Sequence, residues 1–485
     1  MKKNIFLIIA AMMLVSASVS AKSYKRGVSE NSFSLAVEMD VLTPGVSWYY
    51  NWSNIPNTGV DNQVLEYEGD FEFVPMAWNA NYNADAIREF VGKHPECKYI
   101  LGYNEPNFTA QANMTPAQAA EKWPELVALA NELDLQIIAP ALNYSPNPPY
   151  QSPTAWFDEF NNLVGSDSYD FVAIHAYGGY GVLTDLATTF HDRYGKPVWV
   201  TEFCYWPDTG NTSSLVTPAS QISFMISTVE WLETTDWIYR YAWFKAKGAC
   251  DSATGPNYGL IVPQRGYDPR QLSTQGYIYT YMSDFDKNLW HAVGETFPAV
   301  DYVASLNVGL NPGTYSDCAK PIEISQFNAG AYADYQFDVP QAGRYTLRLT
   351  VGGYGEPSRF DPQLQVMRLD GEAETPVSEV TKFSLPNDDS TYTTAEIALQ
   401  LSAGKQTLRL SDVAPYQPSG IRIANIALAE EGAGVKDILS DNQASVVDVY
   451  TLQGICIRKN VSPQDATAGL PAGVYVVGNR KVNVK

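Results

Sequence analysis

The sequence predicts a (β/α)8 TIM barrel followed by an antiparallel β-sandwich and a small β C-terminal domain. Three patterns along the 485 residues indicate this fold class. Up to about residue 295, near-continuous apolar runs alternate with helix-like segments, as in a parallel sheet covered by helices. Short alternating runs separated by turn residues follow, as in a sandwich, and the last residues form short strands with glycine-rich turns. The predicted domains are residues 22–295, 296–430 and 436–485.

The first residues are predicted to be a secretory signal peptide, residues 1–21. Lys2 and Lys3 precede an apolar run, and the small residues Val19-Ser20-Ala21 form a cleavage site. A membrane anchor is the alternative, but the apolar run is shorter than the roughly 20 residues that a spanning helix needs. We therefore expect a secreted protein of the periplasm, the cell surface or the extracellular space, without a transmembrane segment.

Eight strands are predicted in the barrel, with helices between them. Thr115-Pro116 and Gln118 give one helix a capping box and a proline in its first turn, and Thr217-Pro218 opens another. The first strand has the weakest pattern, and without it the count is seven. The strands are expected at residues 26–31, 46–52, 71–78, 99–106, 135–144, 171–177, 197–203 and 238–244.

Composition argues against several classes of function. The formal net charge of −21 should repel nucleic acid and anionic lipid but allows a neutral substrate. The five cysteines and four histidines show no metal-ligand spacing, and no phosphate-binding, dinucleotide-binding or serine-hydrolase motif occurs. Cys204 and Cys250 would lie near the same end of adjacent strands, so they are the pair to test for a disulfide, although free buried thiols are expected.

Two glutamates follow apolar runs directly, at the ends of the predicted fourth and seventh strands. Glu105 lies in LGYNEP, where Pro106 restricts it to an extended conformation, and Glu202 lies in WVTEF. Because the carboxyl ends of barrel strands form the active face, both carboxylates are expected at one mouth. A lone Asn-Glu-Pro is at least as often a simple turn. Two rigidly held carboxylates, however, suit glycoside hydrolysis, with retention at a separation of about 5–5.5 Å and inversion at a wider one.

Aromatic residues are concentrated around the predicted mouth. All eleven tryptophans lie between Trp48 and Trp290. Indole faces stack on sugars, and their N–H groups bond hydroxyls. We therefore predict substrate contacts for the tryptophans at or just beyond strand ends, and packing for the others. The first group is Trp48, Trp52, Trp78, Trp206 and Trp243, and the second includes Trp123, Trp156, Trp199 and Trp231.

His175 and Tyr177 close the sixth predicted strand on one face, because strand residues two apart point the same way. A packed structural histidine is the ordinary interpretation of His175 alone. Next to Tyr177, and on the strand before Glu202, His175 is predicted to orient the nucleophile or to bind a sugar hydroxyl.

Six motifs occur in order between residues 24 and 295: GVSWYYNW, FVPMAW, LGYNEPN, APAL, FVAIHAY and WVTEFCYW. Together they resemble glycoside hydrolase family 128, β-1,3-glucanases of clan A. The resemblance implies a retaining hydrolase of β-1,3-glucan such as laminarin or curdlan, with no metal or organic cofactor. It implies that Glu105 is the acid/base and Glu202 the nucleophile. It also implies that Asn104 binds the sugar 2-hydroxyl and that Tyr177 hydrogen-bonds the nucleophile.

The remaining domains carry resemblances of their own. FNAGAYADYQFDVPQAGRYTLRL and LSAGKQTLRL resemble carbohydrate-binding modules of families 6 and 35, and Tyr332, Tyr354 and Tyr416 are the aromatic candidates there. A structural or spacer role is the alternative for this domain. VYTLQG and GLPAGVYVV in the tail resemble the C-terminal sorting-like domain of secreted Bacteroidetes proteins.

Three functions stay open at this point. The first is a monomeric, endo-acting β-1,3-glucanase with β-glucan as its partner. The second is a clan A hydrolase of another β-linked polysaccharide, and the third is a catalytically silent glycan-binding protein. The two glutamates in their motifs argue against the third, and only the family resemblance separates the first two.

Overall fold

The computed structural model describes residues 22–65, 69–207, 216–253, 255–262, 271–355, 360–415 and 419–431, and in the tail 447–451, 456–462, 465–471, 473–477 and 480–484. The predicted signal peptide and Tyr416 lie outside the described residues. The chain divides into two compact units, residues 1–428 and residues 429–485. Each unit is described by itself.

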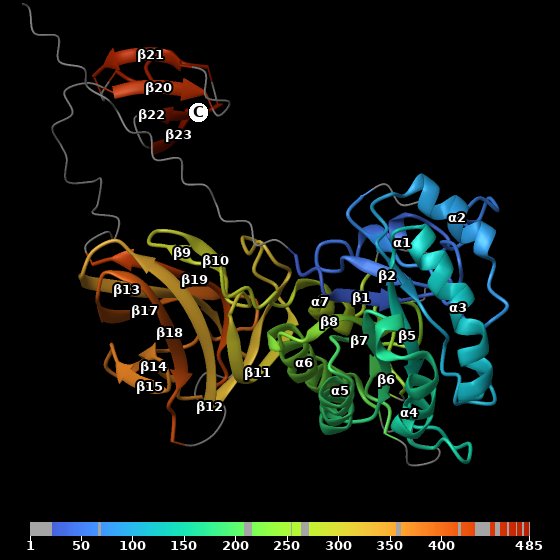
Figure 1. Ribbon diagram of the computed structural model, residues 1–485. Helices are drawn as coiled ribbons and strands as arrows, with labels where there is room; N and C mark the ends of the chain where they lie inside the picture. The colour runs from blue at the N-terminus through green and yellow to red at the C-terminus, as the bar shows by residue number, and fades with distance from the viewer. Residues whose placement is uncertain are drawn as a thin grey trace, which may run out of the picture. The chain divides into compact units, whose positions relative to one another are not determined.

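An eight-stranded parallel sheet forms the N-terminal part of the first unit (Figure 1). The predicted first strand is present and pairs in parallel with the second and the eighth. The spatial order of the strands is β3-β2-β1-β8-β7-β6-β5-β4. The strands are β1 (Arg26–Ser29), β2 (Trp48–Tyr50), β3 (Glu72–Phe73), β4 (Tyr99–Leu101), β5 (Gln136–Leu142), β6 (Phe171–Tyr177), β7 (Val198–Cys204) and β8 (Ile238–Phe244).

The two edges of this sheet approach each other beyond β3. The N–H of Ala77 donates to the carbonyl of Leu101 at 2.8 Å, and the N–H of Leu101 donates to the carbonyl of Pro75 at 2.9 Å. A parallel bridge joins Met76 to Leu101. The sheet is therefore TIM-barrel-like, and large side chains, among them Trp48, Tyr50, Phe171 and Trp199, fill its interior.

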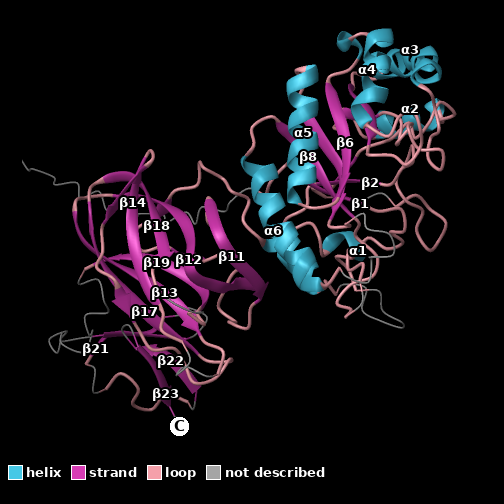
Figure 2. Cartoon of the chain, turned by 90° about the horizontal axis from the view of Figure 1, so that it is seen from below, coloured by secondary structure: helices cyan, strands magenta, loops and turns pink. Residues whose placement is uncertain are grey.

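Helices connect most of the strands, and Figure 2 shows the long helices grouped around these strands. Helix α5 packs on β6 and β7, and α6 packs on β7 and β8. The predicted capping box is present. The Thr115 side chain accepts a hydrogen bond from the Gln118 N–H, and the Gln118 side chain accepts one from the Thr115 N–H. The helices are α1 (Val37–Asp40), α2 (Ala84–Lys93), α3 (Pro116–Glu132), α4 (Pro153–Val164), η1 (Ser166–Ser168), α5 (Tyr180–Tyr194), α6 (Pro218–Thr234) and α7 (Thr274–Tyr281).

An eleven-stranded, mainly antiparallel sheet follows. Its longest strand, β12, pairs with β18 over residues 332–339 and with β19 at Ile324, so its two halves have different neighbours. The strands are β9 (His291–Ala292), β10 (Thr296–Pro298), β11 (Ala304–Pro312), β12 (Ile322–Val339), β13 (Gly343–Gly352), β14 (Gln363–Asp370), β15 (Ala373–Pro376), β16 (Thr381–Lys382), β17 (Tyr392–Leu401), β18 (Gly404–Asp412) and β19 (Arg422–Glu430). Because β9 pairs with β12, this sheet takes in residues before the predicted boundary at 295/296.

Tyr332 and Tyr354, two of the aromatic candidates for sugar binding, already have partners within this sheet. The Arg409 guanidinium lies 3.5 Å from the centre of the Tyr332 ring, so one face of that ring is already covered. The Tyr354 hydroxyl donates to the carbonyl of Ser325. In the barrel-like part, Cys204 and Cys250 are both free thiols; Cys204 is buried as expected, whereas Cys250 is only partly buried, and burial raises the pKa of Cys250 to about 11.

The second unit contains a four-stranded antiparallel sheet in the order β21-β20-β22-β23. Its strands are β20 (Val447–Thr451), β21 (Cys456–Val461), β22 (Gly473–Val477) and β23 (Arg480–Val484). In the part of the chain that the structure describes, no helix combines the length and apolar character needed to cross a bilayer.

Candidate active site

Glu105 lies four residues beyond β4, where the chain still pairs with β5. Its N–H donates to the carbonyl of Ala141 at 2.9 Å, and its own carbonyl accepts from the N–H of Phe108 at 2.9 Å. Its φ is +41°, so the expected extended conformation is wrong. The turn formed with Phe108 outweighs the preference of a residue before proline. A left-handed conformation costs a side-chain-bearing residue about 1–2 kcal/mol, which these hydrogen bonds offset.

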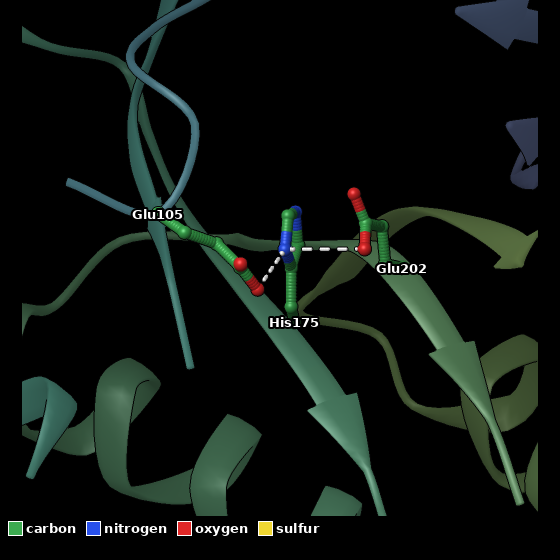
Figure 3. A group of neighbouring side chains, drawn as sticks. All are labelled: Glu105, His175 and Glu202. Atoms are coloured by element: carbon green, nitrogen blue, oxygen red, sulfur yellow. Dashed lines mark hydrogen bonds and ion pairs between the residues drawn. The ribbon is translucent and has the colours of Figure 1, made fainter. Parts of the chain in front are cut away.

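Glu202 lies inside β7, in register with His175 of β6. His175 Nδ1 lies 2.8 Å from Glu105 Oε1 and 3.4 Å from Glu202 Oε2. Figure 3 shows the imidazole between the two carboxylates. The three side chains come from different strands or strand extensions, and the barrel-like sheet brings them to one end.

Three further donors contact the Glu202 carboxylate. Trp52 Nε1–H donates to Oε1 at 2.7 Å, and the Tyr50 hydroxyl donates to the same oxygen at 3.1 Å. The Tyr177 hydroxyl donates to Oε2, so the hydrogen bond that the resemblance implied for this tyrosine is present. Both carboxylate oxygens of Glu202 are therefore held by side chains.

Burial and charge act in opposite directions at this site. Burial raises the pKa of Glu202, His175 opposes this rise, the Glu105 charge adds to it, and the bonds from Tyr177 and Trp52 oppose it. For His175, burial disfavours the imidazolium, but the two carboxylates outweigh it and the pKa is raised. The two carboxylates therefore stabilise the imidazolium form of His175 relative to a free histidine.

A cleft of about 530 Å³ opens above the two carboxylates. Trp52 and Trp78 supply aromatic surface to this cleft, and Asn104 lies beside Glu105. Asn104 Nδ2 donates to Gln111 Oε1 at 3.2 Å, while its Oδ1 is buried and has no hydrogen-bond partner. The lining residues are Asn31, Trp52, Trp78, Asn104, Glu105, Phe108, Gln111, Asn143, Tyr177, Glu202, Phe244 and Lys245.

Several residues that were predicted to contact substrate lie elsewhere. Trp48 is fully buried deep in the sheet, where its Nε1–H donates to the carbonyl of Lys25, and the prediction is wrong. Trp243 is also fully buried, and its Nε1–H donates to the carbonyl of Tyr258. The predicted contact of Trp243 with substrate is therefore wrong too. Trp206 is half-buried, stacks on Tyr258 and is not among the residues that line the cleft.

Strand geometry explains these differences. Residues 48, 50 and 52 share one face, so they reach successive levels of the barrel interior, and only the last meets the cleft. Ala242 faces the interior, so its neighbour Trp243 faces the helices. His175 has no exposed surface, so direct contact with a sugar hydroxyl is wrong, whereas contact with the predicted nucleophile is present.

The sequence analysis missed Tyr50, Asn31, Phe108, Gln111, Asn143, Phe244 and Lys245. Tyr50 could have been found, because it lies between Trp48 and Trp52 on the same face. The others come from loops or strand ends whose positions no sequence period predicts.

The distances in this cluster would also allow a metal ion. One donor atom from each of Glu105, His175 and Glu202 lies within 4.8 Å of the others. Imidazole and carboxylates are ordinary ligands of Zn²⁺. However, His175 Nδ1 and Glu105 Oε1 already lie at hydrogen-bond distance from each other, and a metal would require both atoms to be deprotonated.

A TIM-barrel-like sheet that carries two carboxylates beneath an aromatic cleft defines the class of glycoside hydrolases. The model of the glycosyl hydrolase catalytic core family matches residues 28–279, and the chain belongs to this family. The expectation of a glycoside hydrolase is confirmed. A comparison with curated proteins gave no match.

Three of the solved structures similar to this chain are endo-β-1,3-glucanases of family 128. One is a subgroup II enzyme from Pseudomonas viridiflava, with 32% identity over 54% of this chain and 98% of that chain, at a TM-score of 0.48. A second, a subgroup II enzyme from Sorangium cellulosum, has 29% identity over 53% of this chain and 97% of that chain, at a TM-score of 0.43. A subgroup I enzyme from Amycolatopsis mediterranei, in complex with laminaritriose, has 27% identity over 53% of this chain and 98% of that chain, at a TM-score of 0.42.

Proposed function

We propose that this protein hydrolyses β-1,3-glucan with retention of configuration, with Glu105 as acid/base and Glu202 as nucleophile. One observation carries the proposal: an oxygen of Glu105 and an oxygen of Glu202 lie within 4.8 Å of each other. This short spacing supports the retaining geometry, whose carboxyl groups lie about 5–5.5 Å apart, rather than the about 6.5–9.5 Å of inverting enzymes.

The reaction would proceed in two displacements. Glu202, ionised, attacks the anomeric carbon, while Glu105 transfers its proton to the glycosidic oxygen and releases the leaving chain. Glu105, now ionised, takes a proton from water, which attacks the glycosyl-enzyme and frees Glu202. The hydrogen bond between Glu105 and His175 keeps a proton next to the acid/base between these steps.

The six motifs support β-1,3-glucan as the substrate. The cleft supports a neutral chain, because Trp52 and Trp78 present ring surface and Asn104 keeps a free acceptor oxygen beside Glu105. We propose that Asn104 Oδ1 accepts a hydrogen bond from the sugar 2-hydroxyl. We also propose endo action on a chain that lies across the cleft.

Export and the accessory parts complete the proposal. A signal peptide at residues 1–21 would deliver the protein to the periplasm, the cell surface or the extracellular space. The antiparallel sheet would serve as a carbohydrate-binding-module-like sandwich, and the tail as a sorting-like domain. We expect a monomer, and an acidic chain of net charge −21 is not expected to bind nucleic acid.

The first experiment is incubation of the mature protein with linear β-1,3-glucan and with β-1,4- and β-1,6-glucans, and separation of the products by size over time. A ladder of β-1,3-oligosaccharides is expected. A single small product would replace endo by exo action, and turnover of another glucan would change the linkage. Binding without turnover would indicate a silent glycan-binding protein.

Variants and product stereochemistry test the two roles. Glu105→Gln should lower turnover about 10²–10⁴-fold, the range of general acid–base catalysis, and Glu202→Gln should remove most of it while glucan binding persists. Glu121→Gln, in the exposed part of α3, is the control. Proton NMR of the first products should show the β-anomer. Release of the α-anomer, or near-normal turnover by Glu202→Gln, would overturn the mechanism.

A further inference from the structure

Two donors on one short segment meet the same oxygen of Glu202. Tyr50 closes β2, and Trp52 follows two residues later. Their O–H and N–H groups converge on Oε1, while Tyr177 holds Oε2 from the opposite side of the barrel mouth. The segment of residues 50–52 is therefore aimed at one atom of the proposed nucleophile.

Trp52 is fixed in this orientation by its backbone and its neighbours. Its φ is +57°, a left-handed conformation that a tryptophan adopts only when the surroundings impose it. Its ring packs edge-on against Tyr50, with centroids 5.3 Å apart, and against Phe244 at 5.9 Å. Together these contacts direct Nε1–H toward Glu202 and leave ring surface in the cleft.

The Glu202 carboxylate needs such donors because it is almost completely buried, with 5% of its surface exposed. A buried carboxylate stays ionised only where charges or hydrogen bonds replace the lost water. The groups that face it from the elements packed around it are Tyr50, Trp52, Glu105, His175, Tyr177 and Cys204.

We propose that Trp52 and Tyr50 are positioning residues that hold Oε1 of Glu202 and keep the nucleophile ionised, and that Trp52 also forms the wall of the sugar site beside it. This proposal deepens the proposed function and rests on it. A tryptophan that only stacks on sugar would need no contact with the carboxylate. The 2.7 Å bond from Nε1 is the feature that distinguishes the two roles.

The test removes the hydrogen-bond donor and keeps an aromatic ring at each position. Trp52→Phe and Tyr50→Phe each delete one hydrogen bond to Oε1. Each should lower kcat about tenfold, because a bond to a charged group is lost. Since hydrogen bonds to the ionised form lower the pKa of a carboxylate, their removal raises it, and the acidic limb of the kcat/KM profile should move to higher pH. KM should change little for Tyr50→Phe.

Trp78→Phe is the matched control, because Trp78 lines the same cleft without a hydrogen bond to Glu202. It should raise KM and leave the acidic limb in place. Trp52→Phe with an unmoved acidic limb and a change in KM alone would overturn the proposal. Circular dichroism and thermal unfolding identify variants that fail to fold.

A readout without substrate separates this proposal from the proposed function. Carbon-13 NMR of labelled glutamates, assigned with Glu202→Gln, follows the titration of the Glu202 carboxyl group directly. A higher pKa in Trp52→Phe than in wild type supports the anchoring role even if the wild type cleaves no β-1,3-glucan. An identical titration refutes it even if the glucanase assay succeeds.

Discussion

Replacement of His175 by glutamine should destabilise the protein in a way that depends on pH. The variant removes the one cation that lies between two buried carboxylates. In the state in which both carboxylates are ionised, two unit charges within 4.8 Å repel by about 3 kcal/mol at an effective dielectric constant of about 20, and this repulsion would no longer be offset. At about 2–4 °C per kcal/mol for a domain near this size, Tm should fall by roughly 6–12 °C.

The pH window follows from the directions of the shifts. Because the pKa of His175 is raised, its stabilising charge is fully present below about pH 6.5, the unfolded value, and is lost as the pH rises through the folded value. Because the pKa of Glu202 is also raised, its ionised form costs stability above the unfolded value of about 4.5. The loss in His175→Gln should therefore be large from above about pH 4.5 through pH 6.5, and it should become smaller at lower pH and as the pH rises through the folded pKa of His175.

Differential scanning calorimetry from pH 4 to 9 measures this effect. His191→Gln is the control, because His191 Nδ1 faces the carbonyl of Lys196 rather than a carboxylate. The difference in Tm between His191→Gln and wild type should show no such dependence on pH. A loss in His175→Gln that is the same at every pH would mean that packing, not charge, is the role of His175, and the reasoning above would be refuted.

Three further predictions follow from the described contacts. Dialysis against EDTA should leave glucan hydrolysis unchanged, whereas a loss that Zn²⁺ restores would show that the Glu105–His175–Glu202 cluster is a metal site. Burial raises the pKa of Asp412 from 3.8 to about 6, so ionisation of this group costs stability that develops as the pH rises from 3.8 and is complete above about pH 6. Asp412→Asn should therefore raise Tm more at pH 8 than at pH 4, and equal shifts at both would contradict this. A Cβ on Gly27 would lie 2.3 Å from the Trp48 ring, so Gly27→Ala should cost about 1–3 kcal/mol in chemical denaturation, and a neutral result would show that the barrel interior can shift.

The sequence predicted the strand framework well, because apolar runs and helix caps are local signals. Even the weak strand at residues 26–31 was correct, since Gly27 and Val28 have partners on both sides. The approach of Glu105 to Glu202 could be predicted from their places at strand ends, because parallel strands end on one face.

Orientation and depth within the barrel were predicted less well. Trp48 and Trp52 belong to the same motif, yet one is buried in the interior and the other reaches the cleft, because depth depends on register and not on residue type. The left-handed conformation of Glu105 is held by the turn with Phe108 together with a hydrogen bond to Ala141 of β5, and the second of these contacts is distant in sequence. Lys245 reaches the cleft from just beyond β8, and its sequence neighbours give no sign of it.

The packed interior of the barrel-like sheet limits how a polymer could pass the proposed catalytic residues. From Trp52 the rings of Tyr50, Trp48 and Trp199 continue inward without a break, with centroids 5.1–6.2 Å apart. Arg240 lies over the rings of Trp48 and Trp199 deeper in the sheet. A glucan chain therefore cannot thread through the ring of strands. Under the proposed function, the chain would have to bind, be cut and be released on the same face, as expected for cleavage in the middle of a long polymer.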